Sequence, residues 1–293
     1  MRILLLCLFS LLAACQSHTV SPPPAAIAPG RDHADLGVIR ELASGRTLTP
    51  QELVERLAVA PRVLVGEQHD NPDHHALQLW LLRELASQRP QGSLLMEMLN
   101  PNQQDKIDAA QAATRAGQPP ADPYQALAWQ ANWDWGVYGA LVTYALRQPY
   151  PLLSANLDRA QIMQIYQQRP TLTGEASTTR QVQATLLDDI RESHCGLLPE
   201  AQMPAMLAVQ QQRDRRMAER LLAAPTPAVL LAGAFHVRKD LGVPLHLKDL
   251  GAGEGNVVLV LAEAGKTVSA ESADYVWYTA AQPEQDHCAK LRR

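Results

Sequence analysis

The stretch R-V-L-V-G-E-Q-H-D-N-P-D-H-H-A-L-Q, residues 62–78, decides the fold of this chain. Its apolar run at 63–65 is too short for a helix and predicts a buried strand. The run stops at Gly66, and Pro72 suits the first position of a helix, with Asp73 in the first turn where the helix dipole favours an acid. The stretch therefore predicts a strand that leads through a short polar turn into a helix.

Three titratable side chains, Glu67, His69 and Asp70, lie in that turn. Ligands of open α/β sheets bind at the carboxyl ends of the strands. A solvated turn can also carry such residues, but three of them within four positions favour a site.

Similar apolar runs recur along the chain, separated by segments with helical spacing. This alternation predicts an α/β fold with a mostly parallel sheet flanked by helices. The segments 100–148 and 159–224 are longer than simple crossovers need, and we expect them to form a helical lobe over the carboxyl edge of the sheet. The other expected strands are 93–99, 150–156, 228–234, 257–262 and, on an edge, 275–278; the other expected helices are 48–59 and 72–88.

The length of 293 residues allows one large core or two modest ones. The net charge is −4 and the sequence pI is near 6.1, so the chain has no electrostatic footprint for nucleic acid.

The N-terminus carries a targeting signal. A short apolar run leads to L-A-A-C, which ends at Cys15 and resembles the bacterial lipobox. In a lipobox the signal peptide is cleaved before the cysteine, which becomes the mature N-terminus and is lipidated, for example with palmitate. An ordinary signal peptide cut nearby is the alternative. We expect a signal peptide at 1–14, a lipidated cysteine and flexible tether at 15–36, and one domain at 37–293. Gln16, in place of an aspartate, favours the outer membrane, with the leaflet left open.

Two cysteines, Cys195 and Cys288, remain once Cys7 leaves with the signal peptide and Cys15 takes the lipid. In an oxidising compartment they predict a disulfide, with two independent thiols as the alternative. Neither belongs to a C-x-x-C pair, so the sequence has no motif for covalent haem attachment.

Polar side chains end four of the predicted strands: Glu67 with His69, Glu97, Asn156 with Arg159, and His236. Two histidines and two carboxylates suit metal binding or acid–base chemistry. Taken singly, Glu97 can be a buried acid satisfied by backbone donors and His236 a core histidine. Their recurrence at the same place on successive strands favours a site.

Five stretches carry a resemblance: G-E-Q-H-D-N-P-D-H-H-A-L-Q at 66–78, W-D-W-G-V-Y at 133–138, S-A-N-L-D-R at 154–159, H-C-G-L-L-P at 194–199 and G-A-F-H at 233–236. They resemble the ChaN family, iron-regulated haem-binding lipoproteins within the haem-uptake/Tiki superfamily. The resemblance runs from about Gly37 to the end of the sheet, and the first motif, with its doubled His74-His75, is the most specific.

This resemblance implies an outer-membrane lipoprotein that binds haem for haem and iron acquisition, a binding protein rather than an enzyme. It implies a non-covalent b-type haem between two protomers, with a tyrosine on the iron, and leaves open an outer-membrane haem receptor as a partner. Tyr138 best matches a family tyrosine, although that residue can be structural. The alternatives are Tyr144, Tyr150 and Tyr166.

Cationic and imidazole groups would meet the haem propionates through charge-assisted hydrogen bonds. The candidates are Arg159, Lys106, Lys239 and His194, which can instead be a ligand of the haem iron. The arginine-rich helix expected at 199–223 suits a solvated face with local ion pairs. Arg213 or Asp214 can instead line the haem pocket.

A metal-dependent hydrolase is the alternative function, because the wider superfamily includes hydrolases. In that case His69 and His236 would bind a metal or act as base, and Glu67 would activate water beside Glu97. No G-x-S-x-G or H-E-x-x-H motif strengthens this alternative.

The lipobox makes a direct prediction. The variant Cys15→Ser removes the thiol that takes the lipid, so the precursor should stay unlipidated, and either soluble or uncleaved. Mass spectrometry of the expressed protein checks this, with Cys7→Ser as the control that processes normally. A lipid-bearing Cys15→Ser protein would contradict the assignment.

Overall fold

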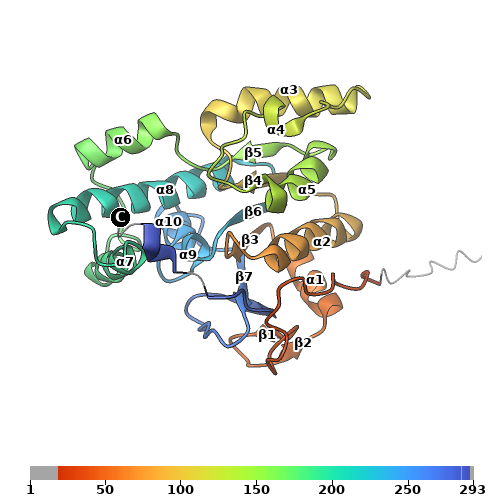
Figure 1. Ribbon diagram of the computed structural model, residues 1–293, viewed down its shortest axis with the longest axis horizontal. Helices are drawn as coiled ribbons and strands as arrows, with labels where there is room; N and C mark the ends of the chain where they lie inside the picture. Colours follow the sequence, from red (N-terminus) through yellow and green to blue (C-terminus); the bar gives the residue numbers. More distant parts are fainter. Residues whose placement is uncertain (1–18, 285, 291–293) are drawn as a thin grey trace, which may run out of the picture.

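A computed structural model describes residues 19–284 and 286–290. Its strands form one eight-stranded sheet in the order β2-β1-β8-β7-β3-β6-β4-β5, with helices on both faces (Figure 1). The strands from β8 to β5 run parallel, while β1 and β2 extend the sheet antiparallel. The strands are β1 (Ile39–Glu41), β2 (Thr47–Leu48), β3 (Arg62–Glu67), β4 (Ser93–Met96), β5 (Leu152–Ser154), β6 (Ala228–Gly233), β7 (Asn256–Glu263) and β8 (Tyr275–Thr279).

The helices connect and cover these strands. They are α1 (Pro50–Ala58), α2 (Pro72–Gln88), α3 (Gln104–Arg115), α4 (Pro123–Ala126), α5 (Trp135–Leu146), α6 (Arg159–Gln168), α7 (Arg180–Ser193), α8 (Met203–Ala223), α9 (Ala234–Val237) and α10 (Val243–Asp249). Short 3₁₀ turns lie at Pro101–Gln103, Glu200–Gln202 and His287–Lys290.

The central strand β3 is buried on both faces because its side chains alternate between two cores. Val63 and Val65 pack in the core beneath α1, α2, α3 and α5. Leu64 packs in the opposite core, against α8, α9 and α10. A continuous apolar run is therefore what this position in the sheet requires.

Local sequence signals account for the ends of the first two helices. Thr49 caps α1 and forms a reciprocal capping box with Glu52. Asn71 caps α2, and Pro72 occupies its first turn. The expected helices at 48–59 and 72–88 are confirmed.

The order of the strands differs from the prediction at one edge of the sheet. The strand at 275–278 forms as β8, but it lies between β7 and β1 and is not an edge strand. The pair β1 and β2 covers it. These strands are three and two residues long and have no apolar run, so their pattern gave no strand signal.

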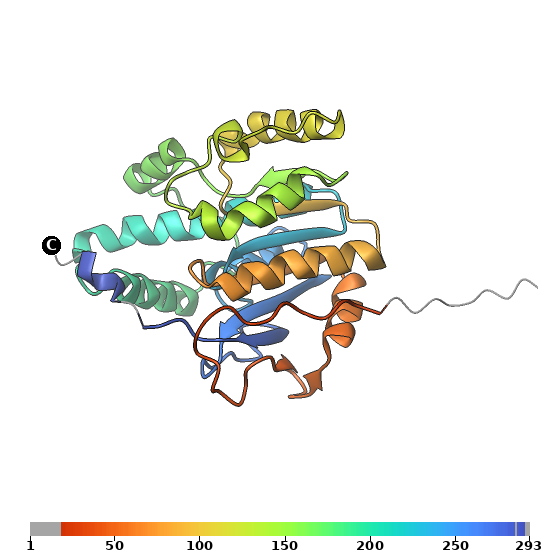
Figure 2. The same cartoon turned by 45° about the vertical axis from the view of Figure 1, so that its right-hand side comes forward.

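The helical lobe at the carboxyl edge comes mainly from 159–224. Helices α6 and α7 and the start of α8 extend beyond the strand ends (Figures 1 and 2). From 100–148, α3 and α5 instead lie over the sheet and its β5 side, and α5 packs on α2. The loop before α5 brings Trp133 to the carboxyl edge, where its ring contacts His69.

The N-terminal segment 19–36, which we expected to be a flexible tether, is held against the domain; we call it the strap. The Trp80 indole donates to the Ser21 carbonyl oxygen, and the Asp73 carboxylate accepts from the Ile27 and Ala28 backbone amides. An isolated antiparallel β-bridge joins Gly30 to Ala281, which follows β8. The signal peptide and Cys15 lie outside the described residues.

The predicted disulfide is confirmed. Cys195, just after α7, is bonded to Cys288 in the C-terminal tail, with the two Cα atoms 5.9 Å apart. The bond fastens the tail to the helical lobe. Within residues 19–284 and 286–290 no helix has the length and apolarity needed to cross a membrane.

Gly66 controls how closely α9 approaches β3. A Cβ at Gly66 would lie 2.5 Å from Val237 Cγ2 and 2.9 Å from Ala234 Cα, so Gly66→Ala must push α9 outward. We expect a loss of about 1–3 kcal/mol in the free energy of unfolding, measured by urea denaturation. Gly253→Ala is the control, because its Cβ would meet only ordinary contacts with Lys248 at 3.5 Å. Equal stability of the two variants would contradict the packing argument.

Candidate functional site

The carboxyl edge of the sheet carries a buried cluster of carboxylates and histidines. Glu67, the last residue of β3, is 2% exposed. Its Oε1 accepts hydrogen bonds from the Tyr138 hydroxyl at 2.5 Å and from His69 Nδ1 at 2.9 Å. Its Oε2 lies 3.3 Å from His75 Nδ1. One carboxylate thus joins the strand end to α2 and α5.

The His75 ring is surrounded by acceptors. Its Nε2 donates to the His69 carbonyl oxygen at 2.9 Å, while Nδ1 faces Gln78 Oε1 and Glu67 Oε2. A protonated imidazole satisfies all three contacts. The His69 ring is oriented in a similar way by Glu67 and leaves its Nε2 facing Glu97 Oε2 at 4.0 Å.

Glu97, one residue beyond β4, is the second buried carboxylate. Its Oε2 accepts from the Gly233 amide at 2.8 Å, and its Oε1 lies 3.2 Å from His236 Nε2 and 3.7 Å from Arg213. His236 Nδ1 contacts Asp214 of α8 at 2.5 Å. His236 is therefore held between two carboxylates.

The electrostatics of the cluster keep its acids ionised. Burial alone would raise the pKa of Glu67, but hydrogen bonds from His69 and His75 lower it to about 2. Burial opposes ionisation of Glu97 too, yet the charges of His236, His69 and Arg213 hold the pKa of Glu97 well below its usual range.

The histidines respond in the opposite direction. Burial would lower the pKa of His236, but the charges of Glu97 and Asp214 raise it to about 10. The pKa values of His69 and His75 are raised against the same burial effect, chiefly through hydrogen bonds to Glu67. His74 behaves differently, because burial lowers its pKa to about 3 and its Nε2 pairs with the Thr279 hydroxyl.

Tyr138 belongs to this network. Its side chain is 1% exposed, and its hydroxyl donates to Glu67. Burial and the neighbouring Glu67 charge raise the pKa of Tyr138 far above its ordinary value, so forming a phenolate there is strongly disfavoured. This geometry matches the structural role that the sequence left open for Tyr138.

The cluster opens to solvent through a small cavity of about 200 Å³, lined by His69, Gly233, Phe235, His236 and Ile190. Pockets for drug-sized ligands span roughly 300–1,000 Å³, so this cavity is too small to enclose a macrocycle. Phe235, at 61% exposure, stands at its mouth.

The strand-end constellation thus assembles as the sequence predicted. Glu67, His69, Glu97 and His236 come together, and Arg213 and Asp214 line the same site. Asn156 contributes through its side-chain amide, which donates to the Glu97 carbonyl oxygen. Across residues 19–284 and 286–290, however, no three histidine, cysteine or acidic side chains are arranged to hold a metal ion.

The other candidate residues do not join the cluster. Lys106 is exposed on α3, and Arg159 is exposed as the first residue of α6. Lys239 pairs with Asp274 at 2.6 Å. His194 Nδ1 donates back to the Ile190 carbonyl oxygen at the end of α7. One protomer therefore does not bring these four together with Tyr138.

Sequence reasoning missed His75, Trp133 and Phe235 as site residues. His75 had a signal, since it lies in the first turn of the helix that follows the strand carrying Glu67. Trp133 reaches the site through the path of the loop before α5, and Phe235 through the position of α9 after β6. No local pattern encodes either placement.

Helix α6 is exposed along its length, because none of its ten residues is buried, as is also the case for the short α4. Arg159, Ile162, Met163 and Tyr166 recur at helical spacing and share one face. Met163 is 48% exposed, and Ile162 and Tyr166 are partly exposed. Helix α6 packs on α8, and Gln161 and Ile165 on its other side line a hollow with Arg216 of α8. The face bearing Tyr166 is therefore largely apolar and partly exposed.

Comparisons with known proteins show what this chain is similar to. The family model described as "Haem-binding uptake, Tiki superfamily, ChaN" matches residues 53–247. The structure of ChaN from Campylobacter jejuni, described as showing cofacial haem binding, is 30% identical in sequence and has a TM-score of 0.75, covering 83% of this chain and 97% of that chain. A comparison with curated proteins finds no match.

More distant structures share less. An erythromycin esterase, EreC, is 12% identical with a TM-score of 0.46, covering 87% of this chain and 86% of that one. A Bacillus cereus protein is 11% identical with a TM-score of 0.40, covering 72% and 68%. These likenesses are too weak to support a function.

The buried pair of Glu97 and His236 makes a testable prediction. The raised pKa of His236 contributes stability that is fully present below pH 6.5 and is lost as the pH rises through about 10. Glu97→Gln removes one of the two anions, so it should lower the pKa of His236 by about 1–3. Titration by NMR of the histidine Cε1 proton measures this.

Glu97→Gln should also lower the free energy of unfolding at neutral pH by about 3–5 kcal/mol, because it leaves a buried charge with one partner fewer. Glu192→Gln, at an exposed position near the end of α7, is the control. An unchanged His236 titration in Glu97→Gln would contradict the described pairing.

Proposed function

This chain belongs to the ChaN family of the haem-binding uptake, Tiki superfamily, and we propose that it binds haem for uptake. The observation that carries the proposal is the similarity to C. jejuni ChaN, which extends over 97% of that haem-binding chain. The rest of the proposal concerns where and how this chain holds its haem.

The exposed face of α6 supplies the surface. Ile162 and Met163 offer an apolar contact for the porphyrin plane, and Tyr166 and Arg159 lie at either end of the same face. Tyr166 is the axial ligand in this proposal, because a phenolate is a hard donor that suits ferric iron and a single axial bond permits release. Arg159 binds a propionate as a charge-assisted pair.

Tyr166 replaces Tyr138 as the proposed ligand. A haem iron could reach the Tyr138 oxygen only by breaking its hydrogen bond to Glu67 inside the core. The Tyr150 side chain is 5% exposed, and burial raises its pKa to about 13. Tyr144 is partly exposed but lies on α5 beneath Arg83 of α2, away from the face of α6 that bears Tyr166.

Two protomers complete the site. A single protomer leaves the face of α6 uncovered, and a second copy would bury the other side of the haem. His194, Lys106 and Lys239 are the candidates to meet propionates from the partner. The proposed haem is b-type and non-covalent; the disulfide between Cys195 and Cys288 supports this, because it leaves neither thiol free to attach a haem.

Location follows from the lipobox. A lipid on Cys15 would anchor the chain to the outer membrane, where it can receive haem from or pass haem to a membrane receptor. Catalysis is not part of the proposal. Both ring nitrogens of His236 already face carboxylates, and the likeness to the esterase is too weak to argue from.

Hemin titration of Tyr166→Phe tests the ligand. The wild-type chain should show a saturable absorbance spectrum with the charge-transfer band of a tyrosinate complex. Tyr166→Phe should abolish that band and weaken binding by at least about tenfold, or about 1.4 kcal/mol. The reason is that phenylalanine keeps the ring contact and removes the donor oxygen.

Tyr144→Phe is the matched control, because it is another partly exposed helical tyrosine. It should leave the band intact. Loss of the band in Tyr144→Phe, with Tyr166→Phe unchanged, would move the ligand to α5. Absence of saturable binding in the wild-type chain would end the haem proposal.

A further inference from the structure

The direction in which the strap runs along α2 shows at which end of the domain the strap begins. Val20 is hydrogen-bonded to Gln51 at the start of α1 and Ser21 to Trp80 in the middle of α2, whereas Ile27 is hydrogen-bonded to Asp73 at the start of α2. The strap therefore runs antiparallel to α2, from the amino edge of the sheet towards the carboxyl edge. Figure 2 shows this path beneath α2.

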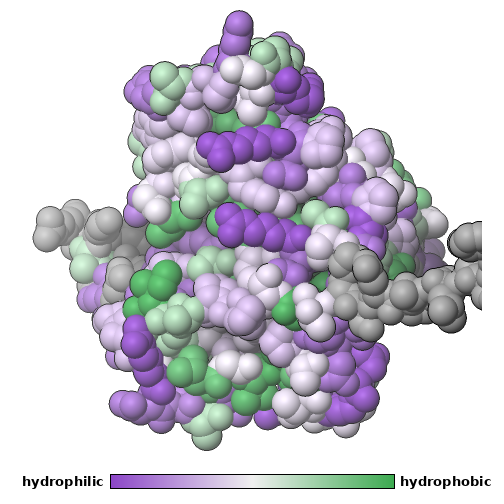
Figure 3. Space-filling model, turned by 90° about the vertical axis from the view of Figure 1, so that its right-hand side faces the viewer, coloured by the Kyte–Doolittle hydropathy of each residue, from purple (hydrophilic) through white to green (hydrophobic). Residues whose placement is uncertain are grey.

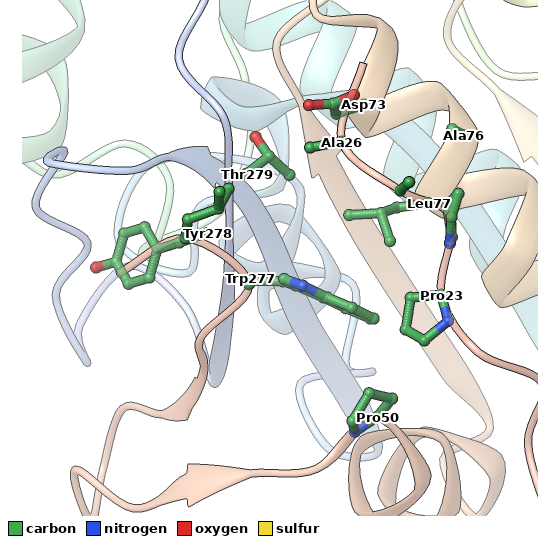
Figure 4. A pocket seen from close by; sticks show the side chains of 13 residues that line it. Pro23, Ala26, Pro50, Asp73, Ala76, Leu77, Trp277, Tyr278 and Thr279 are labelled. Atoms are coloured by element: carbon green, nitrogen blue, oxygen red, sulfur yellow. The ribbon is translucent and has the colours of Figure 1, made fainter. Parts of the chain in front are cut away.

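The strap is packed as well as bonded. Pro23 and Ala26 of the strap, Leu77 of α2 and Trp277 of β8 surround a cavity of about 270 Å³ (Figure 4). Ala28 is 2% exposed. These contacts fix the point on the domain surface from which the chain that precedes residue 20 must extend.

Little chain separates the strap from the proposed lipid. Five residue steps join Cys15 to Val20, and an extended chain covers at most about 3.6 Å per step, or ~18 Å in all. A lipid on Cys15 would thus hold this end of the domain close to a membrane. The strand-end cluster lies one strand length farther away, about 20 Å for the six residues of β3.

Arginines gather at the same end. Arg62 begins β3, Arg89 follows α2, Arg115 ends α3, Arg147 follows α5, and Arg83 lies in the last third of α2. We call these five arginines, with Val59 after α1, the amino-edge surface. Figure 3 shows the right-hand side of Figure 1, where the ends of α2 and α3 lie, with strongly hydrophilic side chains set among apolar ones.

These arginines lack anionic partners in the part of the chain that the structure describes. The ion pairs at 4.0 Å or less there involve other arginines. Arg89 donates to the Ala60 carbonyl oxygen, and the Arg83 guanidinium lies over the Tyr144 ring, so their described partners are uncharged. Arg83 and Arg147 border an open hollow of about 390 Å³ with Tyr144 and Trp135.

The apolar and acidic residues at this end agree with that picture. Val59 is 85% exposed, the most exposed of the large apolar side chains among the described residues. The nearby acids are Glu55 on α1, the buried Glu84 on α2, Asp122 before α4 and Glu254 before β7, so the five arginines still outnumber them.

We propose that the amino-edge surface lies against anionic phospholipid headgroups and turns the haem-binding lobe away from the membrane. The proposal rests on the lipid anchor of the proposed function. Headgroup phosphates supply anionic partners for the exposed Arg83, Arg115 and Arg147, and each cation near an anionic surface adds to the attraction within about a Debye length. Val59 enters the interface, and the strap sets the orientation.

The test uses the mature lipoprotein purified from membranes and inserted into vesicles of phosphatidylglycerol and phosphatidylcholine, or of phosphatidylcholine alone. A fluorophore is attached at Val59→Cys on the amino-edge surface or at Ala184→Cys, an exposed position on α7 at the other end. A quencher on the lipid headgroup reports the distance of each from the membrane. With phosphatidylglycerol, quenching at position 59 should exceed that at position 184 by at least about threefold.

Matched variants test whether the difference in quenching depends on the charges of the arginines. Arg83→Gln, Arg115→Gln and Arg147→Gln together should bring the two positions to similar quenching, as should about 0.5 M salt, because screening weakens exposed charges. Arg169→Gln, Arg180→Gln and Lys266→Gln remove the same charge from exposed positions elsewhere and should leave the difference intact.

Equal quenching at positions 59 and 184 in the wild-type chain would overturn the proposal. So would a difference that survives the loss of the three amino-edge arginines. A mature protein without acyl mass that fails to float with vesicles would remove its premise, and the hemin spectrum of the same sample shows whether haem binding stands independently.

Discussion

Burial of two ionised carboxylates at the strand ends is the constraint on which the rest of the site depends. Removing a carboxylate from water costs several kcal/mol, and here partners from distant segments offset that cost. His69 and His75 neutralise Glu67, and His236 neutralises Glu97. Because these partners come from the turn after β3, from α2 and from α9, the carboxylates fix how three elements meet above the sheet.

This mutual satisfaction also explains where ligand binding belongs. Both ring nitrogens of His236 face carboxylates, and the cavity beside the cluster measures about 200 Å³. Haem is better accommodated on an open, largely apolar face, and α6 supplies one because it lies beyond the sheet and packs mainly on α8. In the proposed function, the charge-paired cluster thus serves stability and the exposed helix serves binding. At the opposite end, the strap and the arginines are proposed to orient the same domain.

Much of the fold could be predicted from local pattern, and part of the site could not. Strand runs such as 63–65 and the caps of α1 and α2 are encoded by neighbouring residues, and strand-end positions foretold the meeting of Glu67, His69, Glu97 and His236. The role of Tyr138 was not readable, because it depends on α5 packing against α2 so that its hydroxyl reaches Glu67. The docking of the strap depends on bonds from Asp73 and Trp80, far along the chain, while its Pro and Ala composition indicates flexibility. Long-range partners decide such features, and spacing along one sequence does not reveal them.

We propose that two copies of this chain enclose haem between their exposed α6 faces. Sedimentation velocity of the chain from residue 16 onward, with and without hemin, is the first measurement to make. We expect a monomer without hemin and a dimer that saturates at one hemin per protomer, with Met163→Glu on α6 remaining monomeric. A hemin-loaded monomer, or a dimer that forms equally well in Met163→Glu, would contradict it.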